Sequence, residues 1–429
     1  MYAVGATGVI SAGFPAAALT KSKYPVFLAS SLDTEHDAST SPTLCGQTED
    51  PCKSNCVPSN VHSREISLVD IDPTEINITQ ALGGRSSETI ECLRINGCRM
   101  NSAVFAAVVD ELCLLELPNL HTIDISKNKV GGPLAGNALA KLLTHATSTR
   151  FLSLGWNCLA LADLKDICLP ICGVISLDLR SNPLSNSFVR PSSRSSSRSS
   201  SHRSSKSEST DASVDTMAWV STLVSSMPQL THIHLAQASI SDKELTALFH
   251  ALTRPSTRVE YIGLEWLGLG SRLATLRAIM SSLTPAAGLA THSSALHVNL
   301  AANNLGDCGV EIISTSDAKL PSLTLACNFI TERGTGMLAK WLPASSLTAL
   351  DLTDNYFGDQ GIVSLLAVHA GVKPNSYYTQ IKSLGLNSCC LGDTSLRMLA
   401  DAISCKWAPL ESLRILRNSR ISSGAKITL

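Results

Sequence analysis

The sequence predicts an α/β fold in which one short strand and one helix recur along the chain. Three observations indicate this fold. A frame of apolar residues, usually with an asparagine at its ninth position, recurs eleven times between residues 90 and 418. Successive copies lie about 28 residues apart, which leaves room for a helix after each strand. The chain is 44% hydrophobic but only 4% aromatic, so its core must consist of thin layers of Leu, Ile, Val and Ala.

The strand of each repeat is predicted by the frame L-x-x-L-x-L-x-x-N-x-L, which is clearest at residues 347–357. Because strand side chains alternate between two faces, apolar residues at positions 4 and 6 should enter the core. The asparagine at position 9 is expected to turn inward and bond the backbone of neighbouring repeats. It is present as Asn128, Asn157, Asn182, Asn303, Asn328, Asn355 and Asn418, and it is replaced by Cys98, Ala238, Leu267 and Cys389.

The helix of each repeat is predicted to begin just after this frame. Several copies continue with a glycine or serine followed by aspartate, as in Ser241-Asp242, Gly306-Asp307, Gly358-Asp359 and Gly392-Asp393. We expect glycine to turn the chain and aspartate to cap the first helical turn. Apolar residues then recur at helical spacing, for example at Leu245, Leu248, Phe249 and Leu252.

The ends of the repeat array have a different composition. Residues 28–63 turn into Ser, Thr, Asp and Pro without periodicity, so we expect residues 1–63 to form a disordered N-terminal extension. Residues 1–19 have no basic start, which makes a cleaved targeting peptide a weak interpretation. Residues 64–89 are predicted to form an N-terminal cap, because Glu65–Ile71 alternates polar and apolar residues. The repeat array then occupies residues 90–429.

A Ser/Arg-rich insertion at residues 185–216 interrupts the array, where the spacing between two copies doubles. It holds almost no apolar residues, so we expect an exposed, disordered loop. Arginine stands three residues before Ser193, Ser197 and Ser201, which is typical of basophilic kinase sites. RNA binding is disfavoured because the basic stretch from Arg190 to Lys206 contains no Phe, Tyr or Trp for stacking. A tolerated insertion without function is the remaining alternative.

The eleven copies resemble the ribonuclease-inhibitor-type leucine-rich repeat proteins over residues 90–418. The resemblance implies a curved solenoid with parallel strands on the concave side and helices on the convex side. It does not imply a particular partner, because the same scaffold serves inhibitors, receptors, GTPase activators and cytoskeletal proteins.

A candidate binding surface lies where positions 3, 5, 7 and 8 of the frame face the concave side. Aromatic, charged and histidine side chains gather there in repeats three to six, and aromatic residues and arginine form interface hot spots. The candidates are Phe151, Trp156, Asp178, Arg180, His232, His234, Tyr261, Glu265 and Trp266. The alternative is structural, in which Trp156 and Trp266 cover the edge of the asparagine ladder.

Catalytic and metal-binding motifs are missing from the sequence. It contains neither G-x-x-x-x-G-K-[ST], nor G-x-S-x-G, nor H-E-x-x-H. Cys45, Cys52, Cys56 and His62 lack the paired spacing of zinc fingers, and His232 and His234 are only two ligands. We therefore expect no enzyme activity, no cofactor and no metal.

The leading hypothesis is a non-enzymatic scaffold that binds a protein partner through its concave face. The alternative is a GTPase activator of the Ran type, which shares this repeat class but usually ends in an acidic tail, unlike residues 420–429. An innate-immune sensor module is disfavoured, because the sequence has no nucleotide-binding motif.

The partner class and compartment follow from composition. A net charge of −1 makes nucleic acid an improbable partner. No apolar run approaches the roughly 20 residues of a membrane span. Most of the fourteen cysteines sit in hydrophobic patterns, which favours a reducing, cytoplasmic environment. We expect a monomer.

Overall fold

The structure is a computed structural model that describes residues 3–4, 64–167, 173–185, 222–284, 295–366, 377–422 and 427–428. These residues belong to one compact unit, which comprises Met1–Ala12 and Arg64–Leu429. Most of the predicted N-terminal extension and nearly all of the Ser/Arg-rich insertion, with Ser193, Ser197 and Ser201, lie outside the described residues.

A sheet of twelve parallel strands runs through this unit, and the order of the strands in the sheet is their order in the chain. The first strand, β2, lies where the cap strand was expected, and one further strand corresponds to each of the eleven copies of the frame. The strands are β2 (Glu65–Val69), β3 (Cys92–Asn96), β4 (Thr122–Asp124), β5 (Phe151–Ser153), β6 (Ser176–Asp178), β7 (His232–His234), β8 (Tyr261–Gly263), β9 (His297–Asn299), β10 (Ser322–Thr324), β11 (Ala349–Asp351), β12 (Ser383–Gly385) and β13 (Ser412–Arg414). A separate antiparallel pair joins β1 (Ala3–Val4) to β14 (Ile427–Thr428).

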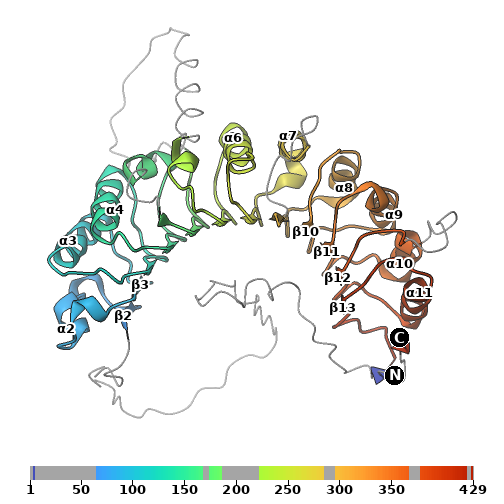
Figure 1. Ribbon diagram of the computed structural model, residues 1–429, viewed down its shortest axis with the longest axis horizontal. Coiled ribbons are helices and arrows are strands. Elements are labelled where there is room, and N and C mark those ends of the chain that lie inside the picture. The colour runs from blue at the N-terminus through green and yellow to red at the C-terminus, as the bar shows by residue number, and fades with distance from the viewer. Residues whose placement is uncertain are drawn as a thin grey trace, which may run out of the picture. The chain divides into compact units, whose positions relative to one another are not determined.

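Helices follow most of these strands and lie on the outer side of the arc, whereas the sheet lines the inner side (Figure 1). They are α2 (Ile78–Leu82), α3 (Ser102–Leu112), α4 (Pro133–His145), α6 (Asp242–Leu252), α7 (Leu273–Ser282), α8 (Gly306–Ser314), α9 (Glu332–Trp341), α10 (Gly358–Leu366) and α11 (Asp393–Ser404). A 3-10 helix, η3 (Leu161–Ile167), takes this place in repeat three. Neighbouring strands are about 4.8 Å apart and packed helices about 8–10 Å apart, so the sheet side must be the shorter one. The predicted curved α/β solenoid is confirmed.

The asparagine ladder forms as the frame predicts. Nδ2 of Asn355 donates to the carbonyl oxygens of Leu325 and Leu352, both at 2.9 Å. Its Oδ1 accepts from the backbone N–H groups of Asn328 at 3.0 Å and Ile330 at 2.9 Å. Its Nδ2 also lies 3.4 Å from the Thr353 carbonyl oxygen, so one fully buried side chain bonds five backbone groups in two repeats.

Position 9 is not equivalent in the copies that lack asparagine. The thiol of Cys98 donates to the Leu68 carbonyl at 3.3 Å, and the thiol of Cys389 donates to the Leu352 carbonyl at 3.2 Å. The two thiols also lie 3.5 and 3.2 Å from the carbonyl oxygens of Asn96 and Asn387, so each cysteine reproduces two of the carbonyl contacts of the asparagine. Ala238 and Leu267 have no polar side chain and cannot do so, which interrupts the ladder in repeats five and six.

The backbone at position 8 is left-handed in every copy from the second to the eleventh. The residues are Lys127, Trp156, Ser181, Gln237, Trp266, Ala302, Cys327, Asp354, Ser388 and Arg417, with φ between 52° and 60°. A non-glycine residue in this region is strained. The same backbone conformation occurs in copies with a small residue at position 8 and in copies with a tryptophan there. It is therefore a property of the repeat and does not by itself mark Trp156 or Trp266 as functional.

The aspartates at the predicted helix starts tie repeats together, which corrects the expectation that each caps its own helix. Oδ1 of Asp307, at the start of α8, accepts from the backbone N–H of Thr331 at 3.0 Å, and Thr331 begins the next helix. Asp359 likewise accepts from Gly392 at 2.8 Å, and Asp393 from Ser422 at 2.8 Å. In α6 the cap is Ser241, which forms a capping box with Glu244. The first N–H groups of the helix in the next repeat lie beside the carboxylate, so the aspartate bonds that helix instead of its own.

The insertion leaves the sheet uninterrupted. Ser176 of β6 is in register with His232 of β7, and Asp178 with His234. The strands on either side of the insertion are therefore direct neighbours in the sheet.

Candidate protein-binding surface

Two groups of side chains occupy the concave side of repeats two to seven. The first, which we call the tryptophan–arginine group, comprises Lys127, Trp156, Asp178 and Arg180. The second, which we call the histidine–tyrosine cluster, comprises His232, His234, Tyr261, Glu265, His297 and Asn299 on or just after β7, β8 and β9. Both are positioned by frame positions 3, 5, 7 and 8.

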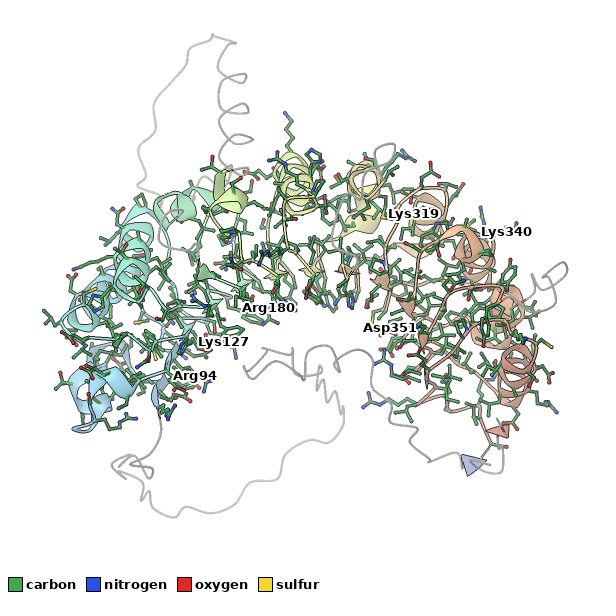
Figure 2. All side chains as sticks on the ribbon, in the orientation of Figure 1. Arg94, Lys127, Arg180, Lys319, Lys340 and Asp351 are labelled. Carbon is green, nitrogen blue, oxygen red and sulfur yellow. The ribbon has the colours of Figure 1, made fainter. Side chains whose placement is uncertain are left out.

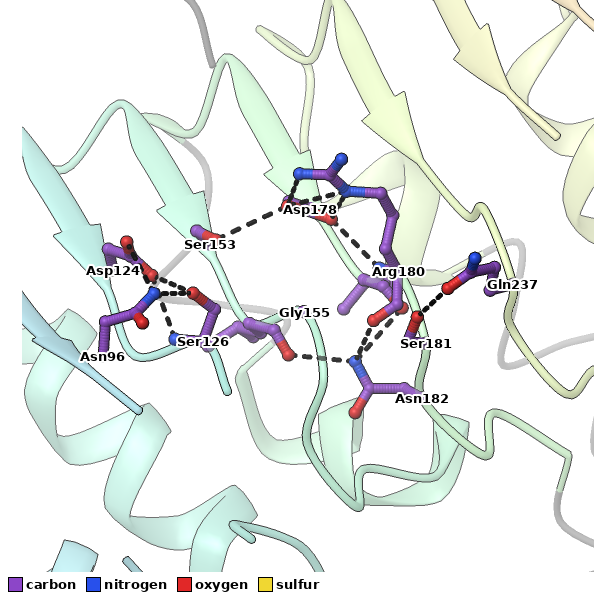
Figure 3. Close-up of polar contacts among 12 residues, drawn as sticks. Asn96, Asp124, Ser126, Ser153, Gly155, Asp178, Arg180, Ser181, Asn182 and Gln237 are labelled. Carbon is purple, nitrogen blue, oxygen red and sulfur yellow. Dashed lines mark hydrogen bonds and ion pairs between the residues drawn. The ribbon is translucent and has the colours of Figure 1, made fainter. Parts of the chain in front are cut away.

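In the tryptophan–arginine group, Asp178 holds Arg180 in a fixed orientation (Figure 3). Nε of Arg180 donates to both carboxylate oxygens at 3.0 and 3.1 Å, and Nη2 donates to Oδ2 at 2.8 Å. The backbone N–H of Arg180 donates to Oδ1 at 3.0 Å. A carboxylate that accepts several charge-assisted bonds is a rigid anchor, so the guanidinium plane is set before any partner arrives.

The oriented guanidinium lies over an exposed ring. Cζ of Arg180 is 4.9 Å from the centroid of Trp156, and Nζ of Lys127 is 5.9 Å from it. Both distances are within the range of cation–π attraction. Trp156 still exposes 39% of its surface, so it presents an aromatic face flanked by two cations.

In the histidine–tyrosine cluster, Tyr261 is the central ring. The ring centroids of His232, His234 and His297 lie 5.9, 4.9 and 5.3 Å from that of Tyr261. The Tyr261 hydroxyl donates to Oε1 of Glu265 at 3.0 Å, and Nδ2 of Asn299 donates to the same oxygen at 2.6 Å. The four rings and the carboxylate thus hold one another across β7, β8 and β9.

Burial sets the protonation of this cluster. It lowers the pKa of His234 and of His297 to about 4, and it also lowers the pKa of His232. The histidines are therefore neutral near pH 7. Burial raises the pKa of Glu265 and of Tyr261, because the charged form of each loses its hydration.

A glycine makes room for the Glu265 carboxylate. A Cβ atom added to Gly263, at position 5 of the same strand, would lie 2.8 Å from Oε2 of Glu265 and 3.1 Å from a ring carbon of Tyr261. Any side chain at residue 263 would therefore push this carboxylate away from its place over the strand. Oε2 is buried and has no hydrogen-bond partner among the described residues.

The nine predicted site residues are brought to one side of the sheet but differ in accessibility. Trp266 is 52% exposed. Arg180, His232, His234, Tyr261 and Glu265 are partly buried. Phe151 and Asp178 expose only 5% and 3%, which corrects the expectation that both lie open on the concave surface. In short parallel strands the side chains at positions 3 and 5 lie against those of the neighbouring strands. The neighbouring side chains therefore cover Phe151 and Asp178.

The sequence interpretation missed Lys127, His297 and Asn299. Each occupies a concave frame position, namely position 8 of repeat two and positions 3 and 5 of repeat seven. Strand register puts His297 beside Tyr261, and Asn299 beside Gly263. Reading every copy in this register would have found them, whereas a search for repeats rich in aromatic residues did not.

Among the described residues, no group of three His, Cys, Asp or Glu side chains is placed to hold a metal ion. Within the same ranges, no helix is long and apolar enough to cross a membrane. What the surface offers is two exposed tryptophans, an oriented guanidinium and a set of neutral rings.

Comparison with known proteins agrees with this architecture. A family model described as "Leucine Rich repeat" matches residues 344–366. The ribonuclease inhibitor of Sus scrofa is 24% identical over 342 residues, covering 75% of this chain and 71% of the inhibitor. In sequence and fold the chain is thus similar to leucine-rich repeat proteins of the ribonuclease-inhibitor type.

Other relatives match this leucine-rich repeat protein over part of their length. NACHT, LRR and PYD domains-containing protein 5 of Mus musculus is 26% identical over 210 residues, which are 48% of this chain and 17% of that protein. Protein 13 of the same series from Homo sapiens is 28% identical and is covered to 19%. The chain thus spans less than a fifth of these two relatives. The solved leucine-rich repeat-containing protein LegL7 from Legionella pneumophila has 17% identity and a TM-score of 0.43, covering 72% of this chain and 91% of that one.

Proposed function

We propose that this leucine-rich repeat protein is a non-enzymatic scaffold that binds a protein partner through the concave face of repeats three to six. Leucine-rich repeat proteins generally mediate protein–protein interaction, and the exposed Trp156 and Trp266 carry the finer proposal. Both stand at position 8, three repeats apart, and expose 39% and 52% of their surface. Large aromatic side chains left open at the centre of a concave surface are typical of interface hot spots.

The charged residues between the two tryptophans have a different part in this proposal. Arg180 is already paired with Asp178, so a partner does not have to provide for its charge. We expect Arg180 to set the orientation of the partner more than the affinity. Ser181 and Gln237, which lie at position 8 between the tryptophans, bond each other at 2.8 Å and give the row a polar middle (Figure 3).

The cellular context belongs to the same proposal. The nine cysteines of the described residues form no disulfides, which supports a reducing compartment such as the cytoplasm. We propose a monomer that needs no cofactor and no nucleic acid. A multiple-turnover GTP hydrolysis assay with small GTPases tests the non-enzymatic part, and acceleration of hydrolysis would contradict it.

Binding through the tryptophans is tested by comparing variants in a quantitative affinity purification and then with the purified partner. Trp156→Ala and Trp266→Ala should each weaken binding by about 2 kcal/mol or more, as expected for hot spots. Tyr356→Ala is the matched control, because Tyr356 is 67% exposed but follows the ladder asparagine of repeat nine. If the tryptophan variants kept every partner, the concave site would be wrong.

The Ser/Arg-rich insertion is proposed as a regulatory segment through phosphorylation of Ser193, Ser197 and Ser201. Three phosphates, at roughly −1.5 to −2 each, would cancel the positive charge of the segment. Equal partner affinity of the triple Ser→Glu and triple Ser→Ala variants would argue against this regulation.

A further inference from the structure

The concave strands carry several acidic side chains, and most of them are paired with a cation from this chain. Asp124 lies 3.7 Å from Nε of Arg94, Asp178 lies 2.8 Å from Nη2 of Arg180, and Asp351 lies 2.7 Å from Nη2 of Arg414. Figure 2 shows Arg94, Arg180 and Asp351 along the inner side of the arc. All three aspartate side chains are strongly shielded, with exposed fractions of 7%, 5% and 14%. A shielded carboxylate on this face is thus ordinarily neutralised internally.

Glu265 departs from this rule. Among the described residues it forms no ion pair, although it stands on the same face and is also shielded from solvent. Its Oε1 is fixed by Tyr261 and Asn299, while its buried Oε2 accepts no hydrogen bond from a described residue. A buried carboxylate oxygen without a hydrogen-bond donor costs free energy. Because the fold holds this oxygen in place, a donor from a binding partner could satisfy it.

We propose that the histidine–tyrosine cluster receives one basic side chain, arginine or lysine, of the protein partner, which pairs with Oε2 of Glu265. This inference rests on the proposed concave-face function and names the chemistry of what is recognised there. The exposed Trp266, which directly follows Glu265 in the chain, shifts to admit the basic group and packs against it.

The surroundings of Glu265 favour a cation over a neutral donor. The three histidines are neutral, and Arg180 is neutralised by Asp178, so no uncompensated positive charge opposes an incoming cation. The faces of Tyr261 and Trp266 attract cations. A neutral donor would bond Oε2 as well but would leave the carboxylate charge uncompensated in a shielded site.

The test uses the full chain labelled with 5-fluorotryptophan. Its five tryptophans give separate ¹⁹F signals, and the signal that is lost in Trp266→Phe is that of Trp266. The probes are N-acetyl-arginine amide, N-acetyl-lysine amide and the isosteric but neutral N-acetyl-citrulline amide. We expect the Trp266 signal to move saturably with the two cations, and about tenfold more weakly or not at all with citrulline. Glu265→Gln should abolish the response. Glu260→Gln should not, because it removes an exposed carboxylate just before the same strand.

Equal responses to arginine and citrulline in the wild-type chain would overturn the inference, and this comparison does not depend on a variant folding. An arginine response that persists unchanged in Glu265→Gln would overturn it as well. Either result would leave concave docking through the tryptophans intact. Conversely, if Trp156→Ala and Trp266→Ala kept every partner, the proposed concave binding site would be wrong. The response to arginine could still be measured in that case.

Discussion

Repeats seven to nine and repeats five to six of this solenoid share the same frame, but they differ at the ladder position and at the concave positions. In repeats seven to nine the ladder is continuous through Asn303, Asn328 and Asn355, each fully buried. In repeats five and six the ladder positions are Ala238 and Leu267, which provide no polar side chain. The concave positions differ in the reverse sense: beyond His297 and Asn299, repeats seven to nine carry mainly Ala, Ser, Thr and Asp, whereas repeats five and six carry His232, His234, Tyr261, Glu265 and Trp266.

The contrast indicates a division of labour along one scaffold. In repeats seven to nine, where the ladder is continuous, the concave face beyond His297 and Asn299 carries mainly small side chains. Where the frame is broken, buried polar and aromatic groups gather. Natural proteins break local rules at functional sites more often than elsewhere, and the interrupted ladder coincides with the histidine–tyrosine cluster. The tryptophan–arginine group instead lies beside an intact ladder, formed by Asn157 and Asn182.

The largest effect should come from breaking the continuous ladder. Asn355→Ala removes five hydrogen bonds and leaves buried backbone groups in two repeats without these partners. We expect a loss of about 3 kcal/mol in unfolding free energy, measured by urea denaturation followed by circular dichroism. Tyr356→Ala, at the exposed neighbouring residue, should change stability little. If Asn355→Ala melted like the wild type, the assigned frame would be wrong.

That ladder could be predicted from sequence because the positions of its residues are set by the local frame alone. Leucines at positions 4 and 6 and the asparagine at position 9 repeat in each copy, so the strands and Asn303 or Asn355 were located correctly. Accessibility on the concave face depends instead on the residues one strand away. Nothing in the local pattern of repeat four shows that Asp178 would be covered, or that Glu265 would fold over Gly263.

The second effect concerns the histidine–tyrosine cluster and its dependence on pH. The pKa values of His234 and His297 are lowered from 6.5 to about 4. The unfolded chain therefore binds protons first as pH falls, and stability present above pH 6.5 is lost progressively down to about 4. The raised pKa of Glu265 works in the opposite sense and offsets part of this loss. We expect a net decrease of about 2 kcal/mol between pH 7 and pH 5.

A double variant isolates the contribution of these histidines. His234→Gln with His297→Gln cannot take up protons in this range, so the urea midpoint should depend less on pH than in the wild type. The same slope in both proteins would show that these two rings do not control the acid sensitivity. The ladder variant Asn355→Ala should keep the wild-type slope, since it lies outside the cluster.

A smaller effect separates the two tryptophans. Trp156 lies against Arg180 and Lys127, whereas no cation–π contact to Trp266 is found among the described residues. Trp156→Ala should therefore cost about 0.5–1 kcal/mol of stability, and Trp266→Ala less. Thermal melting of both variants checks this difference. Equal or large losses in both, with unchanged partner binding, would favour a structural role for the two rings.

The smallest expected effect is that of removing the insertion, which lies between the tryptophan–arginine group and the histidine–tyrosine cluster in the chain. β6 and β7 are direct neighbours in register, so deleting residues 186–216 leaves every strand pair of the sheet in place. Each halving of a flexible loop recovers only about 0.6 kcal/mol of closure entropy, so the unfolding free energy should stay equal or rise by about 1 kcal/mol. Replacing the segment with a Gly/Ser chain of equal length separates the effect of length from that of sequence. Loss of cooperative unfolding in the deletion variant, but not in the Gly/Ser variant, would show that the solenoid needs the length of this connection. Loss in both would show that the native segment packs on the repeats.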